Sequence, residues 1–122
     1  MKQEEKELLL TDISGRLPYG LIVQISLFRN DGRKRDIDLD PHVTENIWEI
    51  IDKYHALPYL LPMSSMTEEE RKEYKHFVAF SGSPDGAANF IDWLNAHHFD
   101  YRGLIEKGLA IAVTEENNPY KE

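Results

Sequence analysis

Two histidines and an aspartate stand close together near the end of the chain, at His97, His98 and Asp100. Imidazole and carboxylate groups hold metal ions and exchange protons, so this cluster is a candidate for metal-assisted hydrolysis. However, neighbouring residues of a helix point about 100° apart, so the two imidazoles do not easily converge on one ion. The chain has no HExxH motif and no further ligand at a useful spacing. We therefore expect structural roles here, with Asp100 as the cap of a following helix.

A second group of carboxylates, Asp36, Asp38 and Asp40, alternates with apolar residues. On a strand these groups share one face about 6–7 Å apart, a spacing that could hold calcium or magnesium. The simpler interpretation is a solvated strand face that ends at a helix cap, because Pro41 follows Asp40 directly. We predict no metal site and no cofactor, and a metal-assisted hydrolase remains the third hypothesis for function.

Four cations surround a predicted hairpin turn at Asn30-Asp31-Gly32. They are Arg29, Arg33, Lys34 and Arg35. A basic hairpin tip is able to enter a nucleic-acid groove or hold a phosphate, which gives a nucleic-acid-associated factor as the second hypothesis. Alternatively, these cations neutralise nearby aspartates and deter edge-to-edge strand pairing. The net charge of −8 argues against a general nucleic-acid coat, so a nucleic acid is the less favoured partner.

The leading hypothesis is a non-enzymatic protein that binds a protein partner through an aromatic and methionine surface. Trp, Tyr, Met and Arg are enriched at the centres of protein interfaces, and they also seal the edges of small cores. The candidate residues are Tyr59, Met63, Met66, Trp93, His97, Tyr101 and Arg102. The sequence specifies neither the partner nor the oligomeric state.

Helical signals recur along the chain. Residues 3–17 are rich in helix formers, with Gly15 weakening the last turn and Pro18 forbidding continuation. Thr67 and Glu70 form a capping box, which predicts a helix to about residue 77. Cap-and-proline pairs start two more helices, at 41–55 and 84–98, and a last short helix runs from Asp100 to Gly108 with a Schellman-type end.

Strand signals centre on one hairpin, formed by residues 21–28 and 33–39, which alternate apolar and polar positions. A hairpin alone is marginal, so a third strand is needed. Residues 78–80 and 109–113 are the candidates, and we favour 109–113; the proline-broken segment 57–63 is expected to be an extended connection. We predict an α+β fold, with a small antiparallel sheet packed against four or five helices. Residues 1–122 form one domain, of which 114–122 are a loose tail.

Composition excludes several classes of protein. The chain has 122 residues and no cysteine, which excludes a disulfide scaffold, a thiolate zinc site and a cysteine nucleophile. No apolar run approaches the ~20 residues that a membrane helix needs. The segment 1–7 is rich in Lys and Glu, unlike a signal peptide. We expect a cytoplasmic protein with no membrane partner.

Three stretches resemble a family of small uncharacterised proteins of gut Bacteroidetes and their phages or other mobile elements. The stretches are residues 6–10 (KELLL) with residues 16–20 (RLPYG), residues 58–70 (PYLLPMSSMTEEE) and residues 92–110 (DWLNAHHFDYRGLIEKGLA). The stretches lie at both ends and in the middle of the chain, and they leave out the hairpin at 21–40. It implies a bacterial cytoplasmic protein and no particular activity.

Overall fold

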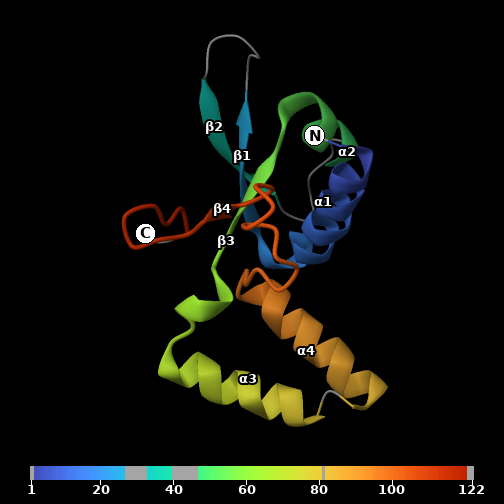
Figure 1. Cartoon of the computed structure of the whole chain (residues 1–122), viewed down its shortest axis with the longest axis vertical. Helices are drawn as coiled ribbons and strands as arrows, with labels where there is room; N and C mark the ends of the chain where they lie inside the picture. The colour runs from blue at the N-terminus through green and yellow to red at the C-terminus, as the bar shows by residue number, and fades with distance from the viewer. Residues whose placement is uncertain (1, 27–32, 40–46, 81, 121–122) are drawn as a thin grey trace.

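The computed structural model describes residues 2–26, 33–39, 47–80 and 82–120, and it combines four α-helices with a four-stranded sheet in that part of the chain (Figure 1). The helices are α1 (Gln3–Arg16), α2 (Ile47–Tyr54), α3 (Glu68–Phe80) and α4 (Pro84–Ala96). The strands are β1 (Leu21–Ser26), β2 (Lys34–Leu39), β3 (Leu57–Leu60) and β4 (Ile111–Ala112). Two 3₁₀ turns, η1 (Leu17–Tyr19) and η2 (Met63–Ser65), complete it. The predicted α+β class is confirmed.

The sheet has the strand order β2-β1-β3-β4 and is mixed. β1 pairs antiparallel with both β2 and β3, whereas β3 pairs parallel with β4. The prediction of an antiparallel sheet was therefore wrong at one edge. The long connection through α3 and α4 returns the chain to the same end of the sheet, and this direction of return makes the last strand parallel.

The third strand was also assigned to the wrong segment. β3, which neighbours β1, comes from residues that the sequence indicated as a connection, and residues 78–80 are the end of α3. Pro58 lies in β3 and cannot donate a ladder hydrogen bond, but β3 overlaps each neighbour over only two residue pairs. The prediction of a strand within 109–113 is confirmed by β4, at the edge of the sheet beyond β3.

The register of the hairpin separates a dry face from a polar face. Val23 pairs with Ile37, and Ser26 pairs with Lys34, so side chains directly opposite each other share a face. The apolar residues of β1 lie in the core with α1 and α2, in a cluster whose fully buried members include Leu9, Ile13, Leu21, Val23, Leu39, Ile51 and Leu60. The other face carries the side chains of Gln24, Ser26, Lys34, Asp36 and Asp38.

α3 and α4 form a helical hairpin that extends below the sheet in Figure 1. α3 packs chiefly along α4, and none of its side chains whose burial is described is fully buried. The contact between the two helices is aromatic, with Phe77 5.7 Å from Trp93 and Tyr74 5.4 Å from Phe90 between ring centroids. No helix in the described ranges combines the length and the apolar content that crossing a membrane would require.

α4 is joined to the main body by a close approach to α1. A Cβ added at Gly15 would lie 3.3 Å from Nδ2 of Asn95, which is tighter than an ordinary contact. Glycine therefore fits the last turn of α1 because another helix lies against it, although it weakens the helix locally.

The segment after α4 keeps its predicted ends but is not a helix. The Asp100 carboxylate accepts hydrogen bonds from the amides of Leu104 and Ile105, at 2.8 and 3.0 Å. The amides of Gly108 and Leu109 donate to the carbonyls of Ile105 and Leu104, which is the Schellman pattern, and Gly108 has φ +73°. The backbone between these ends consists of turns. The segment is so short that its two capping contacts leave no room for a run of i→i−4 hydrogen bonds.

The C-terminal segment is anchored where a loose tail was expected. The Tyr120 hydroxyl accepts a hydrogen bond from the Ile22 amide at 3.1 Å and donates one to the Tyr59 carbonyl at 2.8 Å. The Tyr120 ring stacks on His98, with 4.5 Å between centroids. One aromatic side chain thus anchors the chain to the sheet at residue 120, whereas residues 114–117 are exposed, and the polar composition of the tail does not indicate this contact.

Replacement of Tyr120 by Phe is expected to lower the free energy of unfolding by about 1–2 kcal/mol, because it leaves an amide and a carbonyl without their partner. Urea unfolding followed by circular dichroism measures this loss. Tyr19→Phe is the matched control, since that ring is 39% exposed and its change is expected to lie within about 0.5 kcal/mol of zero. Equal stabilities of the two variants would contradict the anchoring role.

Candidate functional site

The turn between β3 and α3 positions two of the predicted surface residues, Met63 and Met66. Ser65 closes η2 by donating both its amide and its hydroxyl to the Pro62 carbonyl. The predicted capping box then forms, with Thr67 and Glu70 bonded reciprocally at 2.9 and 3.1 Å. Because the helix begins immediately after Met66, both methionines lie beside the first turns of α3.

A groove of about 420 Å³ lies between this turn and α3. It is lined by Met63, Ser64, Met66, Arg71, Tyr74 and Lys75, and we call it the methionine groove. The three helical residues recur at i, i+3 and i+4, so they share one face of α3. Among the described residues, neither the Arg71 guanidinium nor the Lys75 ammonium has an ion-pair partner. The groove therefore combines a polarisable apolar floor with two available cations.

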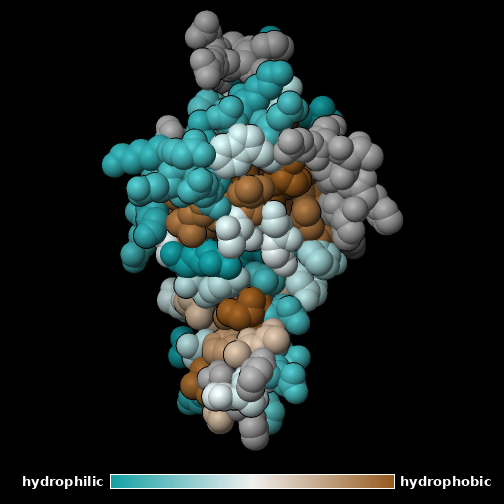
Figure 2. Space-filling view, turned by 90° about the vertical axis from the view of Figure 1, so that its right-hand side faces the viewer, coloured by the Kyte–Doolittle hydropathy of each residue, from teal (hydrophilic) through white to brown (hydrophobic). Residues whose placement is uncertain are grey.

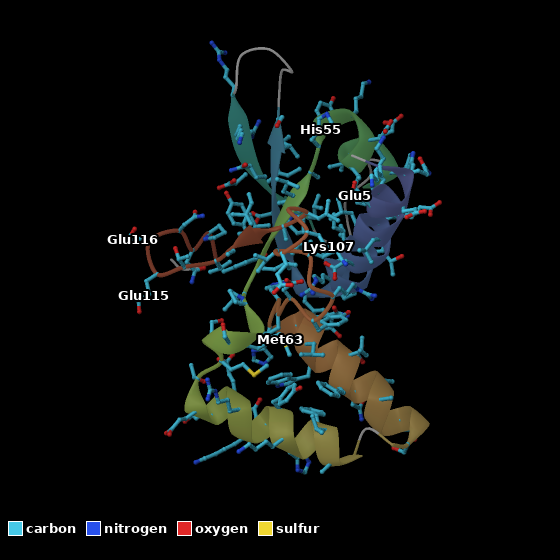
Figure 3. The ribbon with its side chains drawn as sticks, viewed as in Figure 1. Glu5, His55, Met63, Lys107, Glu115 and Glu116 are labelled. Atoms are coloured by element: carbon cyan, nitrogen blue, oxygen red, sulfur yellow. The ribbon has the colours of Figure 1, made fainter. Side chains whose placement is uncertain are left out.

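A second hollow of about 490 Å³ adjoins the methionine groove and shares Met63 and Ser64 with it. Tyr101 and Ile105 supply its other wall, and Glu106 also lines it. Figure 3 shows Met63 at the junction between the sheet and the α3–α4 hairpin. Of the predicted surface residues, the structure thus brings Met63, Met66 and Tyr101 to two adjoining depressions.

Trp93 and His97 lie on the aromatic contact between α3 and the body. The two rings are 4.7 Å apart, and Trp93 lies 5.6 Å from the buried Phe99. The Trp93 indole donates to Glu73 at 2.7 Å, and His97 lies 3.5 Å from a Glu70 carboxylate oxygen. Both residues hold the hairpin together, and neither lines the methionine groove.

Tyr59 is separated from the other surface candidates. It is 3% exposed, and its hydroxyl donates to Asp36 at 2.8 Å and accepts from Gln24 at 3.1 Å. Burial and the neighbouring Asp36 carboxylate raise the pKa of Tyr59 above its ordinary value. This residue organises the polar face of the sheet and offers no surface to a partner.

Arg102 covers a buried ion pair that the sequence did not indicate. Asp12 and Arg16, one helical turn apart in α1, are both fully buried and joined at 2.9 and 3.2 Å. Arg102 donates to the same carboxylate at 3.2 Å, and Arg16 donates to the Phe99 carbonyl at 2.6 Å. The Tyr101 ring lies 5.3 Å from the Arg16 guanidinium and 5.0 Å from that of Arg102. Arg102 is therefore held in a contact that stabilises the fold. The Tyr101 ring takes part in the same contact, although Tyr101 also lines the second hollow.

The histidine cluster near the end of α4 is dispersed by its backbone. His98 has φ +58° and turns its ring onto Tyr120, whereas His97 faces Trp93 and Asp100 caps the next turns. Burial, with the positive charge of Arg16 nearby, lowers the pKa of His98 to about 4. In the part of the chain that the structure describes, no three His, Asp or Glu side chains gather as a metal ion would require.

The basic residues of the hairpin do not share one face. Lys34 lies opposite Ser26 on the polar face, whereas its neighbour Arg35 lies opposite Ile25 and points to the other side. Arg33 is exposed at the start of this segment, and Arg29 lies outside the described residues. Strand alternation therefore splits the cations that the sequence grouped together.

Sequence reasoning missed three residues of the methionine groove, Arg71, Tyr74 and Lys75. Their spacing was the available signal, because a tyrosine between two cations on one helix face, directly after two methionines, departs from a purely solvated helix.

Figure 2 shows hydrophobic residues bordered by hydrophilic ones on the narrow end of the molecule that holds α3 and α4. Val78 is 46% and Ile91 41% exposed in these helices.

Comparison of the chain with models of known families, with curated proteins and with solved structures finds no match. Function must therefore be inferred from the geometry of this chain.

Proposed function

We propose that the protein is a non-catalytic binding module that docks an apolar segment of a partner protein in the methionine groove. The observation that carries this proposal is the juxtaposition of Met63, Met66 and Tyr74 with the available cations of Arg71 and Lys75. Methionine side chains adapt to varied apolar partners, which is why binding surfaces use them often.

The charge of the groove supports a partner segment that is acidic as well as apolar. The whole chain carries −8, yet Arg71 and Lys75 place two positive charges on the rim of the groove. A segment with apolar anchors and neighbouring Asp or Glu residues complements both features. Val78 continues the same face of α3 and is 46% exposed, so it extends the apolar contact toward the C-terminal end of α3.

Selection from a displayed library of random peptides tests this function, since it requires no known partner. We expect enriched peptides to carry apolar anchors flanked by Asp or Glu. Their affinity, measured by fluorescence anisotropy, is expected to fall about tenfold for Met66→Ser, which removes an apolar anchor, and about fivefold for Lys75→Glu.

Lys53→Glu is the matched control, because it makes the same charge change at an exposed position of α2, which does not line the methionine groove, and it is expected to alter affinity less than about twofold. The proposal would be overturned if the selection enriched no peptides that combine apolar anchors with Asp or Glu. So would peptides that bind the Met66→Ser and Lys75→Glu variants as tightly as the parent protein.

A further inference from the structure

A separate hollow of about 350 Å³ opens where β1 ends and β3 begins. Gln24, Ser26 and Lys34 from the hairpin line it, together with His55, Leu57 and Lys107. Three residues labelled in Figure 3 lie around this region: Glu5 from α1, His55 from the link between α2 and β3, and Lys107 from the turns after α4. We call it the polar hollow, and it shares no residue with the methionine groove.

The fold fixes the two lysines by independent means. Lys34 shares the polar face with Ser26 because the two residues are directly paired, and Gln24 lies two positions earlier on that face. Lys107 precedes Gly108, whose left-handed backbone closes the Schellman turn over the core. Residues 73 positions apart in the sequence thus bring two ammonium groups to one hollow.

These polar groups are available to a ligand. Within the described residues, neither the Lys34 nor the Lys107 ammonium has an ion-pair partner, and the Ser26 hydroxyl makes no hydrogen bond. The single acidic residue of the lining, Glu5, accepts the Lys2 amide at 2.7 Å. The lining therefore carries more positive than negative charge, on a chain whose net charge is −8.

His55 adds an imidazole to the lining. It has φ +51° directly after α2, a left-handed position at which helices commonly end, and this turn leads the chain from α2 into β3 beside the hollow.

We propose that the polar hollow binds the phosphate group of a small phosphorylated metabolite. A phosphate monoester presents three terminal oxygens, which match the hydrogen-bond donors of Lys34, Lys107 and Ser26 better than the two oxygens of a carboxylate do. Ser26 and Gln24 supply hydrogen-bond donors, and Leu57 and Leu109 offer apolar contacts to the organic part. The volume falls at the lower end of the roughly 300–1,000 Å³ range of small-molecule sites.

Nuclear magnetic resonance titration of the full chain with glycerol 3-phosphate tests this site at constant ionic strength. The amides of Ser26, Lys34 and Gly108 are expected to shift in a saturable manner. Inorganic phosphate is expected to bind more weakly, because it lacks the organic part, and acetate is expected to bind at least tenfold more weakly. Lys34→Met and Lys107→Met are each expected to weaken glycerol 3-phosphate binding about tenfold, the loss of one charge-assisted contact.

Lys72→Met on α3 is the control and is expected to leave the affinity unchanged, and circular dichroism of each variant reports its folding. Equal binding of acetate and glycerol 3-phosphate would overturn the phosphate assignment in favour of a general anion site. Absence of saturable shifts, or shifts unchanged in both folded lysine variants, would overturn the site itself. Peptide binding by the methionine groove is measured separately, so either proposal can fail without the other.

Discussion

Replacement of Asp12 by Asn is expected to lower the free energy of unfolding by about 3–5 kcal/mol, which is the usual cost of removing one partner of a buried ion pair. The carboxylate accepts from Arg16 and Arg102, and both Asp12 and Arg16 are fully buried. Asparagine keeps the shape of the side chain but leaves a buried guanidinium without its counter-charge. A loss of this size is a large share of the 5–15 kcal/mol that stabilises a typical domain.

Urea unfolding at neutral pH measures this effect, with Asp92→Asn as the control. Asp92 is an exposed residue of α4, and its change is expected to stay within about 0.5 kcal/mol of zero. A double variant, Asp12→Leu with Arg16→Met, is expected to recover part of the loss, since apolar residues often replace a buried pair at little cost. Equal losses in Asp12→Asn and Asp92→Asn would contradict the role of the pair.

Acidification is expected to destabilise the protein by about 3 kcal/mol through His98 alone. The pKa of this imidazole is lowered from its ordinary value of 6.5 to about 4 in the folded chain, first by burial and then by the Arg16 charge. Between these two values the unfolded chain binds a proton that the folded chain excludes. The stabilisation is therefore complete above pH 6.5 and is lost as pH falls from 6.5 to 4. Nδ1 has no hydrogen-bond partner among the described residues, so a proton there would be buried without an acceptor.

His98→Asn isolates this contribution, because asparagine tolerates the positive φ of +58° but does not titrate. We expect the variant to be less stable than the parent at pH 7.5 and the difference to shrink toward pH 4.5. Urea unfolding at four pH values measures the difference. A stability difference between parent and His98→Asn that stays constant across this range would contradict the assignment.

Local signals predicted much of the fold because they act over a few residues. The Thr67 capping box and the Ser83 cap form as expected, with Ser83 accepting the Gly86 amide at 3.0 Å. The hairpin strands pair as their alternation indicates. These features depend on backbone groups and side chains within one turn, so the sequence around them is sufficient.

Features that depend on distant segments were not predicted. β3 has a proline and a continuous apolar run, and it becomes a strand because β1 and β4 lie on either side of it. Tyr59 is buried because Tyr120 and Asp36 reach it from other elements. The sequence alone cannot tell which face of such a strand will be covered.

The candidate site likewise contains residues held by local contacts and residues held by distant ones. Met63 and Met66 line the same groove because the turn and the helix cap that hold them are local. Trp93, Tyr101 and Arg102 have the composition of an interface, but tertiary contacts engage them with Glu73, Asn95 and Asp12. Lys34 and Lys107 meet only in the folded chain, so no motif could have joined them.

The contacts that satisfy the first helix and the first strand bear on the order of events during synthesis. Asp12 bonds to Arg102, 90 residues later, and the Ile22 amide bonds to Tyr120, 98 residues later. Contacts of such long sequence separation form slowly, because a large loop must close before they stabilise anything. The earliest elements to leave the ribosome therefore keep an incompletely paired charge and an open strand until nearly the whole chain has been made. A chain stopped before Arg102 would lack both contacts. We therefore expect this truncated chain to aggregate rather than to persist as a folded fragment.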